Sequence, residues 1–350
     1  YYLFLVLLLI GVNEFIRNLR LDIKHRKDTG KLIHIPEFIK RSCVLLIAGL
    51  LASGTAFTRL ATTMEYGEES IRGKSELTDN IDNKTSGLDK DYATQWSYGI
   101  AETMTLLIPN FHGGASQGAL SMDSELYKTI KRSPNAKKII KQVPLYWGDQ
   151  PIVNGPTYAG SIVLFLFVFG IFFIKSTIRN WILFATIMSI LLAWGKNFMF
   201  LTDLFLNYFP AYNKFRAVST ILIIAELTIP LLGFYALNKL IKDDNLLIVD
   251  KKKYLKLAFY ITGGITLVFA LMPSLFFDFV GVQDSRLEKM GWPIEALQTD
   301  RATLLSKDAW RSFFFIFLSF STLWFFLKKK SEKTDVSKQV ILLIGLLVLV

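Results

Sequence analysis

The fold is decided by residues 181–240, which read WILFATIMSILLAWGKNFMFLTDLFLNYFPAYNKFRAVSTILIIAELTIPLLGFYALNKL. This stretch has two apolar runs joined by a short polar segment. A helix that crosses a bilayer needs about 20 residues, but the first run stops at Trp194. Either this helix is too short to cross the whole bilayer, or Lys196 and Asn197 lie just below the membrane surface. Unpaired polar groups at that depth need water or a partner. The stretch predicts membrane helices with polar side chains near one surface.

The whole chain has the composition of a membrane protein. It has 350 residues, of which 52% are hydrophobic, and 29 are Phe. Apolar runs recur along its length, as expected of membrane helices. We therefore expect an all-α polytopic bundle of about eight transmembrane spans with extracytoplasmic segments. Both ends of the sequence lie inside apolar runs, so we expect a central fragment of a longer protein, with a truncated eighth span.

Apolar and polar runs divide the chain into five predicted segments. We expect residues 1–60 to form two spans with a basic cytoplasmic loop, 61–156 an extracytoplasmic segment, 157–276 spans three to six, 277–311 a second extracytoplasmic segment, and 312–350 the last two spans. These boundaries follow hydropathy, because stretches rich in charge cannot cross the hydrocarbon unaided.

The charge of the chain is uneven across these segments. The formal net charge is +11. Segments expected on one side hold 21 Lys and Arg against nine Asp and Glu, namely residues 13–41, 175–180, 239–256 and 328–338. The alternate segments hold 19 of each sign. Loops rich in Lys and Arg remain in the cytoplasm, so the excess predicts the topology of a multi-pass plasma-membrane protein. It indicates membrane lipids as partners and not nucleic acid.

Polar side chains on the predicted outer side form a candidate site. The candidate ligands for a lipid phosphate are Lys196, Asn197, Tyr212, Lys214, Arg216 and Arg301, and the weak catalytic candidates are Glu102 and Asp149. Lys and Arg suit phosphate oxygens, and a carboxylate can act as general base on an acceptor hydroxyl. The alternative is that the basic side chains only extend from the membrane interface to water.

Other motifs add little chemistry. His25, His34 and His112 are scattered, and no metal-ligating constellation or cofactor motif is apparent. The string YWGDQP at residues 146–151 fits either an aromatic belt at the membrane interface or a sugar-stacking surface in which Asp149 accepts hydroxyl hydrogen bonds. Whether any reaction depends on a divalent metal is left open.

Glu226 is the one carboxyl predicted inside the membrane. Pro230 follows it by four residues and cannot donate to its carbonyl, so we expect a kink there. Such a residue is either functional or a neutral, hydrogen-bonded carboxyl between helices. A kinked, charged helix is typical of transporters, so a transporter or lipid flippase is the alternative function. A scaffold for envelope assembly is a third possibility.

Four strings resemble a known family. They are SYGIAETMTLLIPNFHGGAS (97–116), YWGDQPIVNGPTYAG (146–160), LAWGKNF (192–198) and PAYNKFRAVSTILIIAE (210–226). Together they are similar to bacterial YfhO-like membrane proteins, which are assigned by similarity to the GT-C type of glycosyltransferase.

The resemblance implies an activity. GT-C enzymes move a sugar from a polyprenyl-phosphate donor to an acceptor, here a cell-envelope polymer, at the outer face of the bacterial plasma (inner) membrane. Their catalytic carboxylate usually lies in the first outer loop, near the start of the protein. We therefore expect the catalytic Asp to lie outside this fragment, and the fragment to provide the helical bundle and part of the substrate-facing surface.

Overall fold

A computed structural model describes residues 2–29, 32–73, 81–242, 247–331 and 337–349. The regular secondary structure of these residues is helical, without a β-strand, and Gly118 and Val143 form an isolated bridge. Residues 74–80, part of the first predicted outer segment, lie outside the described residues. The helical part of the predicted fold class is therefore confirmed.

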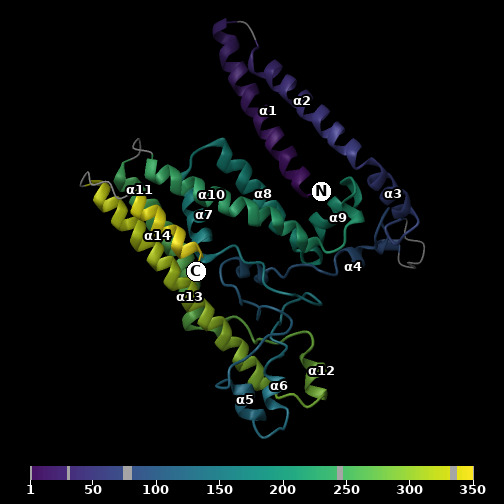
Figure 1. The fold of residues 1–350 in the computed structure, drawn as a ribbon, viewed down its shortest axis with the longest axis vertical. Helices are drawn as coiled ribbons and strands as arrows, with labels where there is room; N and C mark the ends of the chain where they lie inside the picture. The colour runs from purple at the N-terminus through teal and green to yellow at the C-terminus, as the bar shows by residue number, and fades with distance from the viewer. Residues whose placement is uncertain (1, 30–31, 74–80, 243–246, 332–336, 350) are drawn as a thin grey trace. The chain divides into compact units, whose positions relative to one another are not determined.

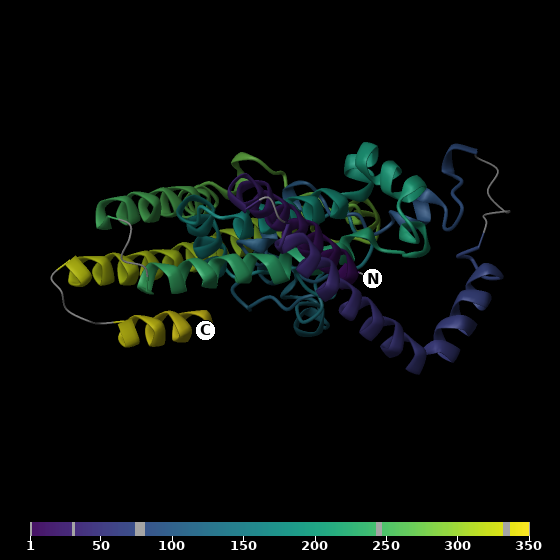
Figure 2. The same cartoon turned by 90° about the horizontal axis from the view of Figure 1, so that it is seen from above.

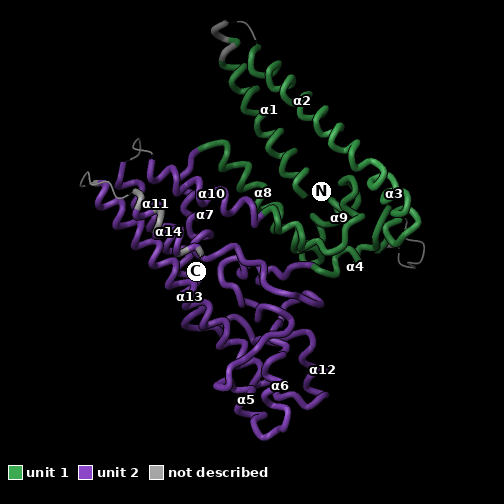
Figure 3. The backbone as a smooth tube through the Cα atoms, viewed as in Figure 1, with its two compact units in different colours: residues 1–96, 176–224 green, residues 97–175, 225–350 purple. Residues whose placement is uncertain are grey.

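The chain forms two compact units, each made of two stretches of sequence (Figure 3). Unit 1 comprises Tyr1–Trp96 and Ser176–Ile224, and unit 2 comprises Ser97–Lys175 and Ala225–Val350. Each unit takes residues both from predicted spans and from predicted outer segments.

Unit 1 is built around a helical hairpin. Its helices are α1 (Tyr2–Thr29), α2 (His34–Thr55), α3 (Phe57–Glu68), α4 (Lys90–Ala93), α8 (Thr177–Ala193) and α9 (Met199–Tyr208), with 3₁₀ turns η1 (Ile81–Asn83), η3 (Gly195–Phe198), η4 (Tyr212–Lys214) and η5 (Val218–Leu222). Asp22 of α1 accepts hydrogen bonds from the N–H groups of Ile33, His34 and Ile35 at 3.0, 2.8 and 2.7 Å. The carboxylate accepts from N–H groups at the start of α2 that have no acceptor within the helix. Its negative charge is also stabilised by the positive end of the α2 dipole.

Unit 2 is a helical bundle with an irregular outer part. Its elements are η2 (Ala101–Leu106), α5 (Glu125–Ile130), α6 (Ala136–Ile139), α7 (Ser161–Phe173), α10 (Ile223–Lys242, whose first two residues belong to unit 1), α11 (Ile248–Leu271), η6 (Pro273–Leu275), α12 (Asp284–Lys289), α13 (Ile294–Ser331) and α14 (Ser337–Leu349). Helix α11 runs beside α13, as Figures 1 and 2 show, and α7 packs against both.

The described residues contain four helices long and apolar enough to cross a membrane. These are residues 2–24 of α1, residues 218–242, α11, and residues 294–330 of α13. The number is six if the bent pairs α2–α3 (76°) and α8–α9 (113°) are each one span. Helices α7 and α14 have 13 residues each, below the about 20 that a span needs. The eight predicted spans are therefore found only in part.

Helix α13 joins a charged half to an apolar half. It has 38 residues, so it is roughly 57 Å long, nearly twice the about 30 Å of bilayer hydrocarbon. Charged side chains occur up to Arg311, an apolar run follows from residue 312, and Lys328 ends it. Much of the predicted outer segment 277–311 thus continues as one helix into the predicted span that follows.

Glycines allow α7 and α10 to pack closely. A Cβ added at Gly170 of α7 would lie 3.0 Å from Leu232 Cγ and 3.2 Å from Ala236 Cβ of α10. A Cβ added at Gly233 of α10 would lie 3.2 Å from the carbonyl oxygen of Val163 on α7. Small residues permit such approach of backbones, from which membrane helices gain packing energy.

We predict that Gly170→Leu destabilises unit 2. Overpacking of a close contact costs typically about 1–3 kcal/mol, so the thermal unfolding temperature in detergent should fall by several degrees. The matched control is Gly264→Leu on α11, because a Cβ there meets nothing within 4 Å. Equal effects of the two substitutions would show that the α7–α10 contact does not depend on glycine.

Candidate functional site

A buried carboxyl group lies in the irregular part of unit 2, which the sequence predicts to be extracytoplasmic. Glu102, in η2, is 3% exposed. Its Oε1 accepts hydrogen bonds from Tyr146 Oη at 2.9 Å and Gln150 Nε2 at 3.0 Å. Its Oε2 accepts one from the Gly99 N–H at 3.0 Å. The carboxyl group therefore fastens residues 146–150 to residues 99–102.

Asp149 lies beside Glu102, although the two are far apart in the sequence. A Cβ added at Gly99 would lie 3.4 Å from Asp149 Oδ2 and 3.5 Å from Glu102 Oε2. Both carboxyl groups therefore lie against one glycine, which has no side chain to separate them. Asp149 is exposed whereas Glu102 is buried. The structure thus brings together the two weak catalytic candidates and gives them different surroundings.

Backbone pairing positions the segment that carries Asp149. Gly118 and Val143 exchange two N–H···O hydrogen bonds of 2.9 and 2.8 Å, and the Trp147 N–H donates to the His112 carbonyl at 3.1 Å. Gly113, with φ of +86°, passes so close to the Leu145 carbonyl that a side chain there would collide with it. Gly148 leaves room in the same way for the Tyr146 hydroxyl. Without these glycines the Tyr146 hydroxyl could not reach Glu102 along this path.

The surroundings change the proton affinities of these groups. Burial raises the pKa of the Glu102 carboxyl above its ordinary range, and the charge of Asp149 adds to this. Hydrogen bonds from its three donors oppose the effect without reversing it. Burial, and then the charge of Glu102, raise the pKa values of Tyr98 and Tyr146. One carboxyl is thus held toward its neutral form beside another open to water, which is how proteins separate an acid from a base.

Arg301 holds the same segment from the side of α13. Its guanidinium is 1% exposed and donates five hydrogen bonds. The acceptors are Leu145 O (3.1 Å), Pro144 O (2.8 Å), Phe279 O (2.8 Å) and the two Asp284 carboxylate oxygens (2.6 and 3.0 Å). Since a guanidinium has five N–H groups, the predicted contact with a lipid phosphate would require breaking one of these bonds. Arg301 instead fixes the residues that precede Tyr146.

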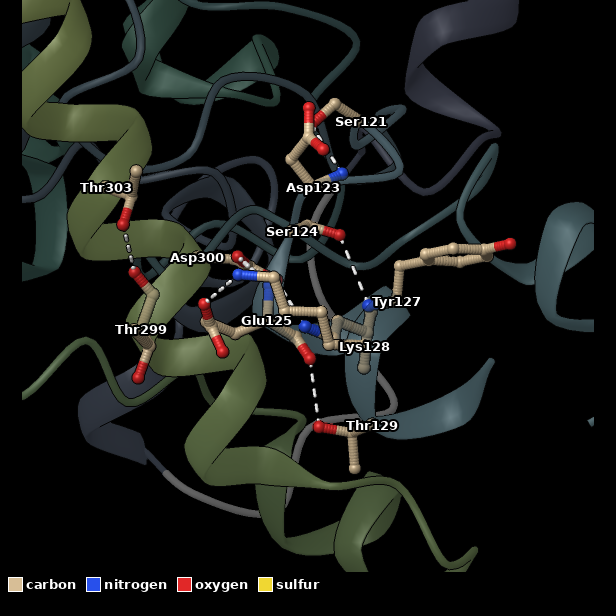
Figure 4. A network of polar contacts seen from close by, with 11 residues as sticks. Ser121, Asp123, Ser124, Glu125, Tyr127, Lys128, Thr129, Thr299, Asp300 and Thr303 are labelled. Carbon is tan, nitrogen blue, oxygen red and sulfur yellow. Dashed lines mark hydrogen bonds and ion pairs between the residues drawn. The ribbon is translucent and has the colours of Figure 1, made fainter. Parts of the chain in front are cut away.

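Asp300, the neighbour of Arg301, fastens a second part of the outer segment (Figure 4). Its carboxylate accepts hydrogen bonds from the N–H groups of Glu125 (2.9 Å) and Leu126 (2.8 Å) at the start of α5. Ser124 Oγ accepts from the Tyr127 N–H at 3.2 Å, as an N-cap residue does. A small apolar core forms behind these contacts, made of Leu126, Ile140, Val143, Leu145 and Leu297.

Contacts with α13 fix where the residues next to the Glu102 site lie along that helix. Ser312 Oγ donates to the Leu107 carbonyl, directly after η2, at 3.1 Å. Asp308 accepts hydrogen bonds from the Asn110 side chain at 2.6 Å and its backbone N–H at 3.2 Å. Residues 308–312 are where the charged half of α13 gives way to the apolar half. The residues that follow η2 therefore lie at the boundary between the polar and apolar parts of unit 2.

Trp147 does not belong to an aromatic belt at the membrane interface. It is 9% exposed and stacks on His112, with ring centroids 4.0 Å apart. Phe277 and Phe279 pack against it. Burial lowers the pKa of His112 to about 3, so this imidazole is neutral at physiological pH. Interfacial anchoring and sugar stacking both require an accessible ring, so neither interpretation of this tryptophan fits.

Glu226 lies in the first turn of α10 and is exposed. Its charge adds to the raised pKa of Tyr98, after burial and the charge of Glu102. Helix α10 continues through Pro230 without a break, although that residue provides no N–H to the Glu226 carbonyl. Glu226 is therefore in the first turn of α10 and near Tyr98, and it is the ninth residue of the candidate span 218–242.

Five of the predicted phosphate ligands lie in unit 1. Lys196 and Asn197 lie in η3, at the 113° bend between α8 and α9, and Lys196 is exposed. The short apolar run in the sequence thus ends because the helix turns. Tyr212 in η4 is 3% exposed. Lys214 donates from Nζ to the carbonyl oxygens of Arg72 and Ser86, both at 2.7 Å, so it holds two loops together.

Arg216 has a different environment from Lys214. Its guanidinium carbon lies 4.1 Å from the centroid of the Trp96 ring and 4.8 Å from that of Tyr92. One N–H donates to Tyr92 Oη at 2.7 Å. The side chain is exposed, so stacking on the rings orients the guanidinium while leaving part of it open to solvent. Among the predicted phosphate ligands, Arg216 is thus ordered and still accessible.

The described residues hold no group of three or more His, Cys, Asp or Glu side chains placed to bind a metal ion. The apolar helices define an all-helical membrane protein. Comparison with known proteins finds no matching family model, no matching curated protein and no matching solved structure. The YfhO-like resemblance therefore remains a hypothesis carried by its four sequence strings.

Several residues of the site were not expected from the sequence. They are Tyr98, Gly99, Tyr146, Gly148 and Gln150. The available signal is that Tyr146 and Gln150 flank Asp149 in one string, which by its composition fits an aromatic belt or a sugar-stacking surface. Nothing in the spacing predicts that Glu102 reaches them.

We predict that Glu102 gives the stability of the protein a distinct pH dependence. Its pKa is raised on folding, from about 4.3 in an unfolded chain, so the folded protein binds the proton more tightly. Protonation of Glu102 adds to the unfolding free energy. This contribution is fully present below about pH 4.3 and is lost as the pH rises through the pKa that Glu102 has in the folded protein. The unfolding free energy of the wild type, minus that of Glu102→Gln, should therefore decrease between about pH 4 and pH 8 in denaturant titrations. A difference that rises with pH would contradict the assignment.

Proposed function

We propose that this protein transfers a sugar from a polyprenyl-phosphate donor to a cell-envelope acceptor at the outer face of the bacterial plasma membrane. The observation that carries the proposal is the Glu102–Asp149 arrangement, in which one carboxyl is buried and fastened and the other is open to solvent. The proposal is supported by the bond between Ser312 and Leu107, which attaches the residues after η2 to α13 where that helix changes from charged to apolar. A lipid-linked donor carries its phosphate and sugar at such a boundary.

The roles follow from accessibility. Asp149 accepts the proton of the acceptor hydroxyl as that oxygen attacks the anomeric carbon of the sugar. The bond between this carbon and the phosphate oxygen breaks, and the polyprenyl phosphate leaves with the electron pair. Glu102 does not meet the substrate, because it is 3% exposed and accepts from three protein donors. It is a positioning residue that holds the segment of Asp149 in place.

Within unit 1, Arg216 is the best-placed of the predicted phosphate ligands, and it is given no role in the step at Asp149, which belongs to unit 2. Its ring-stacked guanidinium is oriented before a ligand arrives, which reduces the entropy that binding would cost. Lys196 is a second exposed cation of the same unit. The YfhO-like strings support the same reaction and a GT-C-like fold.

We predict that Asp149→Asn abolishes most sugar transfer. General base catalysis contributes typically about 10²–10⁴-fold to a rate, and the amide cannot accept the proton. The measurement is transfer from a radiolabelled polyprenyl-phosphate sugar by membranes that contain equal amounts of wild-type or variant protein.

The matched control is Asp123→Asn, which removes an exposed carboxylate from the same outer segment. It should retain the wild-type rate. Transfer by Asp149→Asn within about twofold of the control would remove Asp149 from the mechanism, and with it the observation on which the proposal depends.

A further inference from the structure

Two lysines of α11 converge on one tryptophan of α13. Lys252 Nζ lies 5.3 Å and Lys256 Nζ 5.1 Å from the centroid of the Trp324 ring. All three residues belong to unit 2. Lys256 is exposed, and Lys252 and Trp324 are partly buried. The two ammonium groups are thus held near the same side chain at the surface of the bundle.

Among the described residues, this arrangement places two positive charges with no carboxylate paired to either. Lys252 and Lys256 are four residues apart on one helix, where like charges repel. Neither lysine makes an ion pair with a carboxylate of the described residues. The indole face attracts each ammonium but carries no net charge.

More lysines are gathered at the same end of unit 2. Lys330 Nζ, near the end of α13, donates to the Ile241 carbonyl, near the end of α10, at 2.7 Å. Lys329 lies over the Phe325 ring, with Nζ 5.9 Å from its centroid. Figures 1 and 2 show the start of α11 beside the end of α13. This is the side that the charge distribution predicts to be cytoplasmic.

Apolar side chains lie next to the lysine pair. On α11, Leu257 is 38% and Tyr260 65% exposed, and on α13, Phe325 is 53% exposed. Tryptophan itself favours the membrane–water interface. The neighbourhood therefore offers cations for a headgroup and apolar surface for acyl chains, a combination that a free phosphate ion would not use.

We propose that Lys252, Lys256 and Trp324 form a binding site for the phosphate headgroup of an anionic phospholipid on the predicted cytoplasmic side. The two ammonium groups bind the phosphate oxygens, and the indole packs against the glycerol region. The lipid phosphate compensates the charge of the lysine pair. This site is separate from the Glu102 site and does not depend on the sugar-transfer proposal.

The test is native mass spectrometry of the detergent-purified protein titrated with phosphatidylglycerol or phosphatidylcholine. We expect the wild type to retain phosphatidylglycerol preferentially. Lys252→Ala/Lys256→Ala should bind it at least about tenfold more weakly. The matched control is Lys253→Ala/Lys328→Ala, which removes two exposed lysines near the same end and should bind as the wild type does.

Each other outcome overturns the proposal. Equal weakening in both double variants would mean general attraction of charge and no site. Equal retention of the two lipids by the wild type would mean that the protein does not recognise the headgroup. Displacement of the lipid by free glycerol phosphate at a concentration similar to that of the lipid would mean that the acyl chains are not bound. If the alanine variant fails to fold, two other variants test the site. Lys252→Arg/Lys256→Arg keeps both charges and should retain phosphatidylglycerol, whereas Trp324→Leu should bind this lipid more weakly.

Discussion

Helix α13 imposes the constraint on which the rest of unit 2 depends. Inside hydrocarbon, backbone polar groups must be satisfied within the chain, and α13 meets this requirement while it continues, unbroken, into a charged half. Hydrogen bonds from Ser312 and to Asp308 attach residues 107–110 at the change between the two halves. The residues next to the carboxylate site are thus attached to a helix that has both a polar and an apolar part.

A buried ion pair fixes the site from the charged half of α13. Arg301 and Asp284 are both nearly inaccessible to solvent, and removing one partner of such a pair costs about 3–5 kcal/mol. The same guanidinium donates to the carbonyls of Pro144 and Leu145, which are the two residues directly before the segment that contacts Glu102. Glu102 then draws Tyr146 and Gln150 toward Gly99. Asp149 is exposed, and it lies between Tyr146 and Gln150, whose side chains both donate to Glu102.

The sequence predicted features that depend on composition or on local pattern. Apolar runs predicted membrane helices, because burial in lipid requires a continuous apolar stretch whatever its neighbours are. The number of spans was less well predicted, because α7 is short and the chain bends at Gly195 after α8. Hydropathy does not report bends.

The roles of the basic residues could not be predicted from the sequence either. Arg301 and Lys214 look like phosphate ligands in sequence, and only their hydrogen-bond partners show that they hold loops. The pairing of Glu102 with Asp149 depends on contacts between irregular segments, which have no periodicity to read.

The Glu102–Asp149 site can act on a lipid-linked donor only if it lies at the membrane surface. Its position can be tested by measuring the depth of single spin labels in lipid vesicles, with Cys43, the one cysteine of the chain, replaced by Ser. Labels would be placed by Ile100→Cys beside Gly99, Thr303→Cys in the charged half of α13, and Phe317→Cys in its apolar half. The account predicts that oxygen relaxes the label at 317 most, that a water-soluble nickel complex relaxes the label at 303 most, and that the label at 100 lies between them, at headgroup depth. A label at 100 as accessible to nickel as that at 303, or as shielded as that at 317, would contradict the account.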